Sequence, residues 1–336
     1  MRNKILDDNL LEIKSYLTEK YKKEILGIVV FGSYISGKQD ELSDIDIAVF
    51  LKKEYSFEKI ALDKFSVEIY GYPLNRVRGV LENKRIRNKY ETWYRTCFFL
   101  NMFRHCSIIY DPEKIVVEWK KIAREWTWSK KELREVYYKI LENCRYILSL
   151  YSCNRVAESL ISLRDTVNLL LVYGDMVNNR IPSFRPKELF WKARVLDPRI
   201  KQLYSNVMCI SYLDLKTLNN ILEFVKIIFL KRRKWSYRVE RMFNEVLKSV
   251  KRSKELFVVN SRFFVLSAIK EILQGSEYDI SIKYFDAKNH IRFLEVLNRY
   301  DRELYNVYLS IHNTCSLDNI TQYVSEIENL LQNYVK

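Results

Sequence analysis

Two stretches near the N-terminus decide the fold: VVFGSYISG at residues 29–37 and SDIDIAVF at residues 43–50. The first belongs to an apolar run over residues 25–31 that ends in Gly32-Ser33, which predicts a buried strand closed by a tight turn. The second continues as an apolar run over residues 45–51 and predicts another strand. The residues of this turn and this strand indicate what they could bind.

The turn has the residues of a phosphate loop. Gly32 allows the backbone to turn sharply and to approach a ligand closely. Ser33 can open a following helix, whose free N–H groups and positive dipole end favour phosphate. Gly37 allows a second tight turn four residues after Ser33. We therefore expect phosphate groups to bind at this turn.

Asp44 and Asp46 are two residues apart on the second strand, so their carboxylates should project from one face. Ile45 and Ile47 should then face the core. Two neighbouring carboxylates repel each other, and a cation between them would keep both ionised. Oxygen ligands of this kind suit Mg²⁺ or Mn²⁺ held together with substrate phosphates.

Glu68 is a candidate third ligand. It interrupts an otherwise apolar stretch, FSVEIY at residues 65–70, which predicts a third strand. Placed beside the paired aspartates, Glu68 would complete a three-acid site able to hold two metal ions about 3.5–4 Å apart. Asp63 is the competing candidate, although it precedes the strand and fits a loop better.

The rest of the chain divides into a mixed part and a helical part. A helix is expected over residues 7–23 and a short strand over residues 108–110, which completes a small mixed sheet flanked by helices. Later helices are expected over residues 133–151, 156–173, 214–229, 239–250, 263–273 and 319–334. The prediction is an α+β domain followed by all-α domains.

The helical part also shows weak self-similarity, because residues 195–204 resemble residues 296–305. We therefore expect three domains: a catalytic domain over 1–128, a basic helical domain over 129–240, and a second helical unit over 241–336 that repeats the first. A charged stretch at residues 238–254 is the expected connector.

The net charge of +15 is concentrated in the middle of the chain. Residues 129–240 hold 21 Lys and Arg against 11 Asp and Glu, a net charge of +10. This excess indicates either an anionic partner such as RNA or a charge-rich surface that supports stability. The six scattered cysteines favour free buried thiols over a zinc site. With no apolar run of membrane-span length and no signal peptide, we expect a cytoplasmic protein without a membrane partner.

Two basic runs accompany aromatic residues. The run over residues 76–89 precedes Tyr90, Trp93 and Tyr94, and we favour an exposed helix with its aromatics in the core over an RNA-stacking surface. The run over residues 231–234 could bind phosphates or could end a helix whose dipole favours cations.

The pattern Gly-Ser-x₃-Gly followed by Ser-Asp-h-Asp-h, where h is apolar, resembles the DNA polymerase β-like nucleotidyltransferase superfamily. An α+β domain followed by a helical one is most similar to its minimal and kanamycin-type members. The match covers about residues 27–70. Tyr110-Asp111-Pro112, after a segment with Arg104, resembles the end of that catalytic domain. Many relatives carry Arg before the second glycine, whereas this chain has Ser36 there and Lys38 after Gly37.

The resemblance implies roles for these residues. Gly32, Ser33, Gly37 and Lys38 would bind the nucleotide, Asp44 and Asp46 would bind metal, and Glu68 would be a metal ligand or general base. It implies a metal-dependent nucleotidyltransferase that moves an NMP from an NTP, with ATP the expected donor, to a hydroxyl of a small molecule or RNA, releasing pyrophosphate. A homodimer is also compatible with the resemblance. The alternative is a non-catalytic NTP- or RNA-binding module, such as an antitoxin-like partner.

Overall fold

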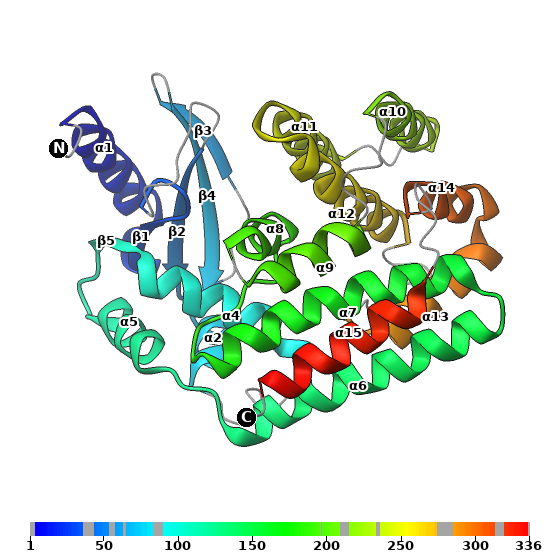
Figure 1. Ribbon diagram of the computed structural model, residues 1–336. Coiled ribbons are helices and arrows are strands. Elements are labelled where there is room, and N and C mark those ends of the chain that lie inside the picture. Colours follow the sequence, from blue (N-terminus) through cyan, green and yellow to red (C-terminus); the bar gives the residue numbers. More distant parts are fainter. Residues whose placement is uncertain are drawn as a thin grey trace. The chain divides into compact units, whose positions relative to one another are not determined.

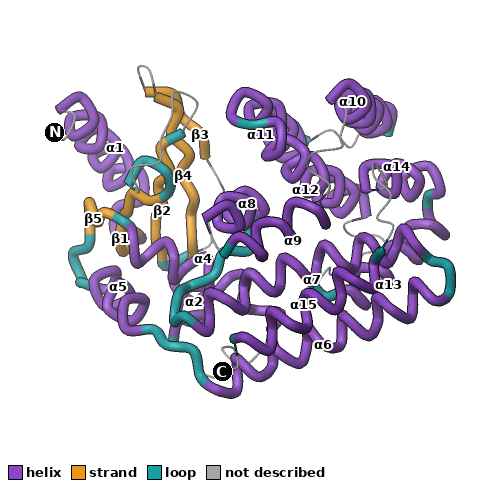
Figure 2. Tube along the Cα trace, viewed as in Figure 1, coloured by secondary structure: helices purple, strands orange, loops and turns teal. Residues whose placement is uncertain are grey.

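The chain divides into two compact units, Met1–Thr127 and Trp128–Lys336, in a computed structural model. The structure describes residues 4–35, 44–53, 58–62, 65–82, 90–195, 197–208, 215–232, 236–273, 285–312 and 319–334. Among these residues, every strand lies in the N-terminal unit and the C-terminal unit is helical (Figure 2). The predicted order of an α+β domain followed by helices is therefore confirmed.

A five-stranded mixed sheet with the order β3-β4-β2-β1-β5 forms the centre of the N-terminal unit (Figure 1). The strands are β1 (Ile25–Phe31), β2 (Ile45–Leu51), β3 (Glu58–Leu62), β4 (Phe65–Pro73) and β5 (Ser107–Tyr110). Strands β2 and β4 run parallel, whereas the other neighbouring pairs run antiparallel. The connection from β2 to β4 passes through β3, which pairs on the outer edge of β4.

Helices cover both faces of this sheet, which is why β1 and β2 read as continuous apolar runs. The helices of this unit are α1 (Lys4–Tyr21), α2 (Leu74–Leu81), α4 (Tyr90–His105) and α5 (Ile115–Glu125). On one face, Ile13 and Leu17 of α1 join the buried aliphatic residues of β1, β2 and β4. On the other, Phe50 contacts Trp119 of α5 and Phe103 of α4, with ring centroids 5.2 and 5.4 Å apart.

The predicted elements of this unit match the structure most closely in the two central strands of the sheet. The strands expected over residues 25–31 and 45–51 are β1 and β2 residue for residue. The third predicted strand continues to Pro73, and the expected first helix begins at Lys4 and is followed by a 3₁₀ turn at Lys22–Glu24. Strand β3 was not predicted.

Ten described helices form the C-terminal unit, and α6 begins with a capping box in which Ser129 and Glu132 bond each other's backbone. The helices are α6 (Lys130–Ser152), α7 (Val156–Val177), α8 (Pro186–Val195), α9 (Pro198–Met208), α10 (Leu215–Lys231), α11 (Tyr237–Arg252), α12 (Lys254–Leu273), α13 (Ala287–Tyr300), α14 (Arg302–His312) and α15 (Ile320–Asn333). Figure 1 shows α15 lying along α6 and α7, which it contacts.

Two buried arginines join the ends of two helices in this unit. Arg164 of α7 and Arg262 of α12 each donate to one carbonyl at the end of α9 and one at the end of α14. The four accepting carbonyls, at 2.6–3.2 Å, belong to Val207, Met208, Ile311 and His312. Final helical carbonyls lack intrahelical partners, so each guanidinium satisfies both helices. Burial lowers the pKa of both arginines, to about 10 for Arg262.

The helices before and after residue 240 share a hydrophobic core. Leu150, Ile161 and Val225 belong to the same buried cluster as Phe264 and Leu294. The stretch at residues 238–254, expected as a connector, is mostly helix α11. The division at residue 240 and the repeat stay predictions. No described helix combines the length and the apolar character that a bilayer crossing requires.

Candidate active site

The turn after β1 is packed directly onto a carboxylate of β2. Gly32 has a φ of +81°, a left-handed conformation that favours glycine. A Cβ atom at this position would lie 2.1 Å from Oδ2 of Asp46 and 3.0 Å from its Cγ. Only a residue without a side chain therefore fits between the turn and Asp46.

Strand pairing brings two of the three predicted acids together. Asp46 of β2 is the register partner of Glu68 in the parallel strand β4 and of Phe31 in the antiparallel strand β1. Register partners on adjacent strands project from the same face of a sheet. Asp46 and Glu68 therefore lie next to each other on the face opposite α1.

Asp44 directly precedes β2 and is half-buried. The neighbouring Ile45 and Ile47 are fully buried in the cluster that includes α1. This alternation confirms the expected orientation of the strand: its apolar residues enter the core, and Asp46 lies on the opposite face.

Tyr70 is a polar partner that the sequence reading missed. Its hydroxyl donates a hydrogen bond to Oε2 of Glu68, which is only 7% exposed. The Tyr70 ring lies 5.9 Å from that of Phe31, which in turn meets Phe98 of α4 edge-on at 6.2 Å. The available signal was the spacing, because residues two apart on β4 share a face.

The described acids are not gathered into a metal-binding group. Among the residues that the structure describes, no three His, Cys, Asp or Glu side chains converge closely enough to hold an ion. The donor chemistry nevertheless fits a hard cation, because Asp44, Asp46 and Glu68 supply only carboxylate oxygens. Among the residues of the predicted site and its motif, Ser36, Gly37, Lys38, Ser43 and Asp63 lie outside the described residues.

Two residues in the segment expected to end the catalytic domain have structural partners on α5. Nε of Arg104 donates to the carbonyl of Ala123 at 2.6 Å, at the end of α5. The carboxylate of Asp111 accepts from the backbone N–H groups of Val116 and Val117 at 3.2 and 2.9 Å, at the start of the same helix. They therefore bind opposite ends of α5.

Described residues in or beside the two basic runs have structural roles within their own units. Trp93 is 1% exposed, so it does not present a surface for stacking bases. Arg232, after the end of α10, forms ion pairs with Asp301 and Glu303. Arg233 and Lys234 lie outside the described part of the chain.

The N-terminal unit thus combines a mixed sheet with a glycine turn that lies against one of two neighbouring carboxylates. The family model described as "Polymerase beta, Nucleotidyltransferase" matches residues 12–71, which include the turn and all three acids. The chain belongs to this nucleotidyltransferase family.

A relative from Methanocaldococcus jannaschii, which carries the provisional name of protein adenylyltransferase, is 33% identical over 88 residues. These residues make up 26% of this chain and 88% of that protein. Among solved structures, a nucleotidyltransferase-like protein from Exiguobacterium sibiricum matches with a TM-score of 0.38 and 12% identity, over 85% of this chain and 90% of that one.

Proposed function

We propose that this chain transfers a nucleoside monophosphate from a nucleoside triphosphate, with ATP as the expected donor, to an acceptor hydroxyl. The observation that carries the proposal is the packing of the Gly32 turn onto Asp46, with Glu68 in register on the next strand. This arrangement supports the proposal because phosphates bound at the turn would lie beside two carboxylates. Family membership supports the same class of reaction.

The proposed reaction is a single displacement at the α-phosphorus. The acceptor oxygen forms a bond to that phosphorus, and the bond from phosphorus to the α–β bridging oxygen breaks. Pyrophosphate leaves with the bonding electron pair. Glu68 accepts the proton of the acceptor hydroxyl as general base, and the hydrogen bond from Tyr70 holds its carboxylate in position. Backbone N–H groups at Gly32 and Ser33 bind the β- and γ-phosphates.

Asp44 and Asp46, together with Glu68, are the residues that would hold Mg²⁺ or Mn²⁺. Such ions, when bound, neutralise phosphate charge and lower the pKa of the attacking hydroxyl. In the same proposal, Gly37 and Lys38 also bind the nucleotide.

A protein hydroxyl is the first acceptor to test, because the curated relative is named as a protein adenylyltransferase. The charge of +10 in residues 129–240 supports RNA as the second acceptor class. Small hydroxylated molecules, expected from the resemblance to kanamycin-type members, form the third.

The experiment incubates the full chain and Mg²⁺ with each α-³²P-labelled NTP and, in turn, a protein extract, total RNA or a small-molecule panel. We expect label transfer into one acceptor class and matching pyrophosphate release. Asp44→Asn and Asp46→Asn should each lower the rate by at least about 10²-fold, because each removes charge that stabilises the transition state. Glu19→Gln, an exposed change on α1, is the control and should leave the rate unchanged. Full activity of either Asp variant would contradict the proposal.

One observation favours the alternative, a non-catalytic NTP- or RNA-binding module: the described carboxylates do not converge on one point. In that case the chain binds NTP or RNA, but no NTP gives pyrophosphate release with any acceptor class. Repeating the binding measurement at 50 and 200 mM salt identifies an RNA contact, since phosphate contacts weaken steeply with salt.

A further inference from the structure

Helix α10 carries an apolar stripe on its outer side. Phe224, Ile227 and Leu230 are 43%, 46% and 51% exposed. Their spacing of three residues places them along one side of the helix. The opposite side of α10 is buried in the core of the unit, where α10 packs against α12 and α14. The outer stripe therefore adds little to the packing of the described helices.

Helix α15 shows that the outer side of a helix with this burial pattern can be polar. Shifted by 102 residues, its buried positions coincide with those of α10. The buried residues of α10 are Leu218, Leu222, Val225, Ile228 and Phe229, and those of α15 are Ile320, Val324, Ile327, Leu330 and Leu331. At the positions that correspond to the stripe, α15 has Glu326, Asn329 and Gln332. A polar outer side is thus compatible with the same pattern of burial, and the stripe of α10 needs another explanation.

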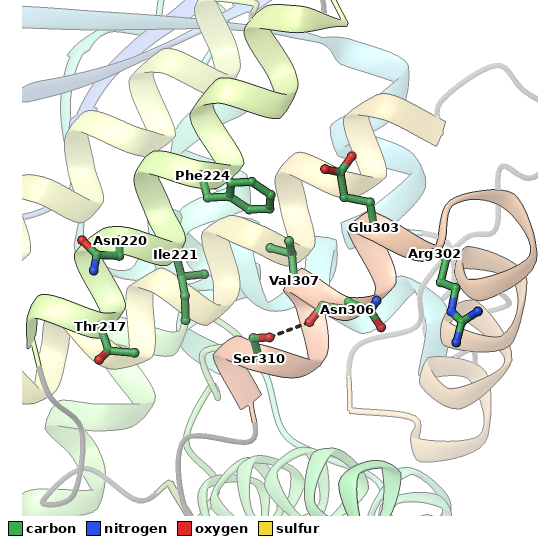
Figure 3. Close-up of a pocket in the computed structure, with 9 residues that line it drawn as sticks. All are labelled: Thr217, Asn220, Ile221, Phe224, Arg302, Glu303, Asn306, Val307 and Ser310. Atoms are coloured by element: carbon green, nitrogen blue, oxygen red, sulfur yellow. Dashed lines mark hydrogen bonds between the residues drawn. The ribbon is translucent and has the colours of Figure 1, made fainter.

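The stripe borders a groove between α10 and α14. The groove has a volume of about 700 Å³, and it contains none of the candidate catalytic residues. Figure 3 shows Phe224 projecting from α10 toward α14, with Ile221 and Val307 below it. Polar residues surround this apolar floor: Thr217, Asn220, Arg302, Glu303, Asn306 and Ser310. An apolar centre with a polar rim is typical of a protein-binding surface.

We propose that the occupant of this surface is α10 of a second copy of the chain, packed antiparallel about a two-fold axis at Ile227. A two-fold interface must be self-complementary, so each residue meets its mirror position along the helix. Phe224 and Leu230 are both three residues from Ile227 and would meet each other across the axis. Glu223 and Lys231 are both four residues away, so the same pairing places opposite charges together at both ends.

Both charges are available for this contact. The Glu223 side chain is 58% exposed, and its Oε2 lies 3.9 Å from Nζ of Lys226, which is long for an ion pair. Lys231 is exposed at the end of α10. The alternative parallel arrangement would put Glu223 against Glu223 and Lys231 against Lys231. Charge therefore selects the antiparallel register.

One helix stripe is smaller than the roughly 800 Å² per partner of a standard interface. We therefore expect a dimer that dissociates on dilution, with closed two-fold symmetry and no larger assembly. Sedimentation velocity of the full chain, from the nanomolar to the high micromolar range, measures this equilibrium.

Four variants and a control test the surface. Ile227→Glu puts a polar side chain where α15 has the polar Asn329, so the unit should fold, whereas two carboxylates would meet on the axis and abolish the dimer. Glu223→Lys and Lys231→Glu should each weaken dimerisation by on the order of tenfold, because each creates two like-charge pairs. The double variant restores both pairs and should return to wild-type affinity. Val195→Glu, at an 82% exposed apolar residue on α8, is the control and should change nothing.

A monomeric wild type across the whole range, or open-ended assembly, overturns the proposal. A dimer that survives Ile227→Glu places the interface elsewhere. Failure of the double variant to recover overturns the antiparallel register. Circular dichroism of each variant verifies that its helical content is retained, so loss of the dimer is not loss of the fold.

Discussion

Replacing Gly32 with Ala tests whether the turn after β1 sets the position of Asp46, one of the carboxylates in the proposed metal site. The added Cβ would lie 2.1 Å from Oδ2 of Asp46, whereas ordinary contacts begin at 3.4 Å. Either the turn or the carboxylate must therefore move by roughly 1 Å. Displacement of a reacting group by this distance costs on the order of 10²-fold in rate.

The variant should nevertheless stay folded. A non-glycine residue in the left-handed region costs about 1–2 kcal/mol, against a typical unfolding free energy of about 5–15 kcal/mol. Nearly all of the variant should therefore stay folded, and unfolding cannot account for a 10²-fold loss. The two quantities are separable by measuring the rate of pyrophosphate release and the free energy of unfolding in urea on the same preparation.

Gly27→Ala is the matched control. Gly27 lies on the same strand, and its added Cβ would meet Cγ2 of Val116 at 2.5 Å without reaching Asp46. This variant should lose stability but keep its rate per folded molecule within about threefold of wild type. If Gly32→Ala also keeps its rate, or if its loss only matches the unfolded fraction, the turn does not position Asp46.

Two further predictions concern side chains of known burial. Tyr70→Phe removes the hydrogen bond to Glu68, so kcat should fall by about tenfold with little change in KM for ATP. Tyr72→Phe is the control. An unchanged kcat for Tyr70→Phe would exclude a role of Tyr70 in positioning Glu68. Burial raises the pKa of the Cys144 thiol to about 12, whereas Cys153 is exposed. At pH 8.5 Cys144 is therefore almost entirely the unreactive thiol. Iodoacetamide followed by peptide mapping should label Cys153 before Cys144, and equal labelling of the two would contradict the burial of Cys144.

The centre of the sheet could be predicted from sequence because burial on both faces leaves a clear pattern. The apolar runs of β1 and β2 are followed by Gly32 and Lys52, at the observed boundaries. Strand β3 could not be predicted in this way. Its sequence, EKIAL, is short and carries two charges, and it forms only because β4 offers a free edge.

The candidate site could likewise be predicted from sequence only in part. Two-residue spacing was enough to place Asp46 on the face opposite Ile45 and Ile47, because strand geometry is local, whereas Asp44 precedes β2 and its role stays a prediction. That Asp46 and Glu68 are register partners follows from a parallel pairing between distant segments, which spacing along the chain does not encode. The contact of Asp46 with Gly32 also depends on β1 and β2 pairing antiparallel with Phe31 opposite Asp46. The charged stretch at residues 238–254 is mostly the amphipathic helix α11, and the domain division expected there stays a prediction.

The two buried arginines of the helical unit bear on how this protein can be dissected. A cut at residue 240 would separate Arg164 from the end of α14 and Arg262 from the end of α9. Each fragment would then keep a buried guanidinium with half of its acceptors, at a cost of about 1–3 kcal/mol for each lost partner. A cut between Thr127 and Trp128 leaves all four of these bonds in one piece. Fragments for binding or crystallisation work are therefore better taken as 1–127 and 128–336, and the helical half should melt in one transition.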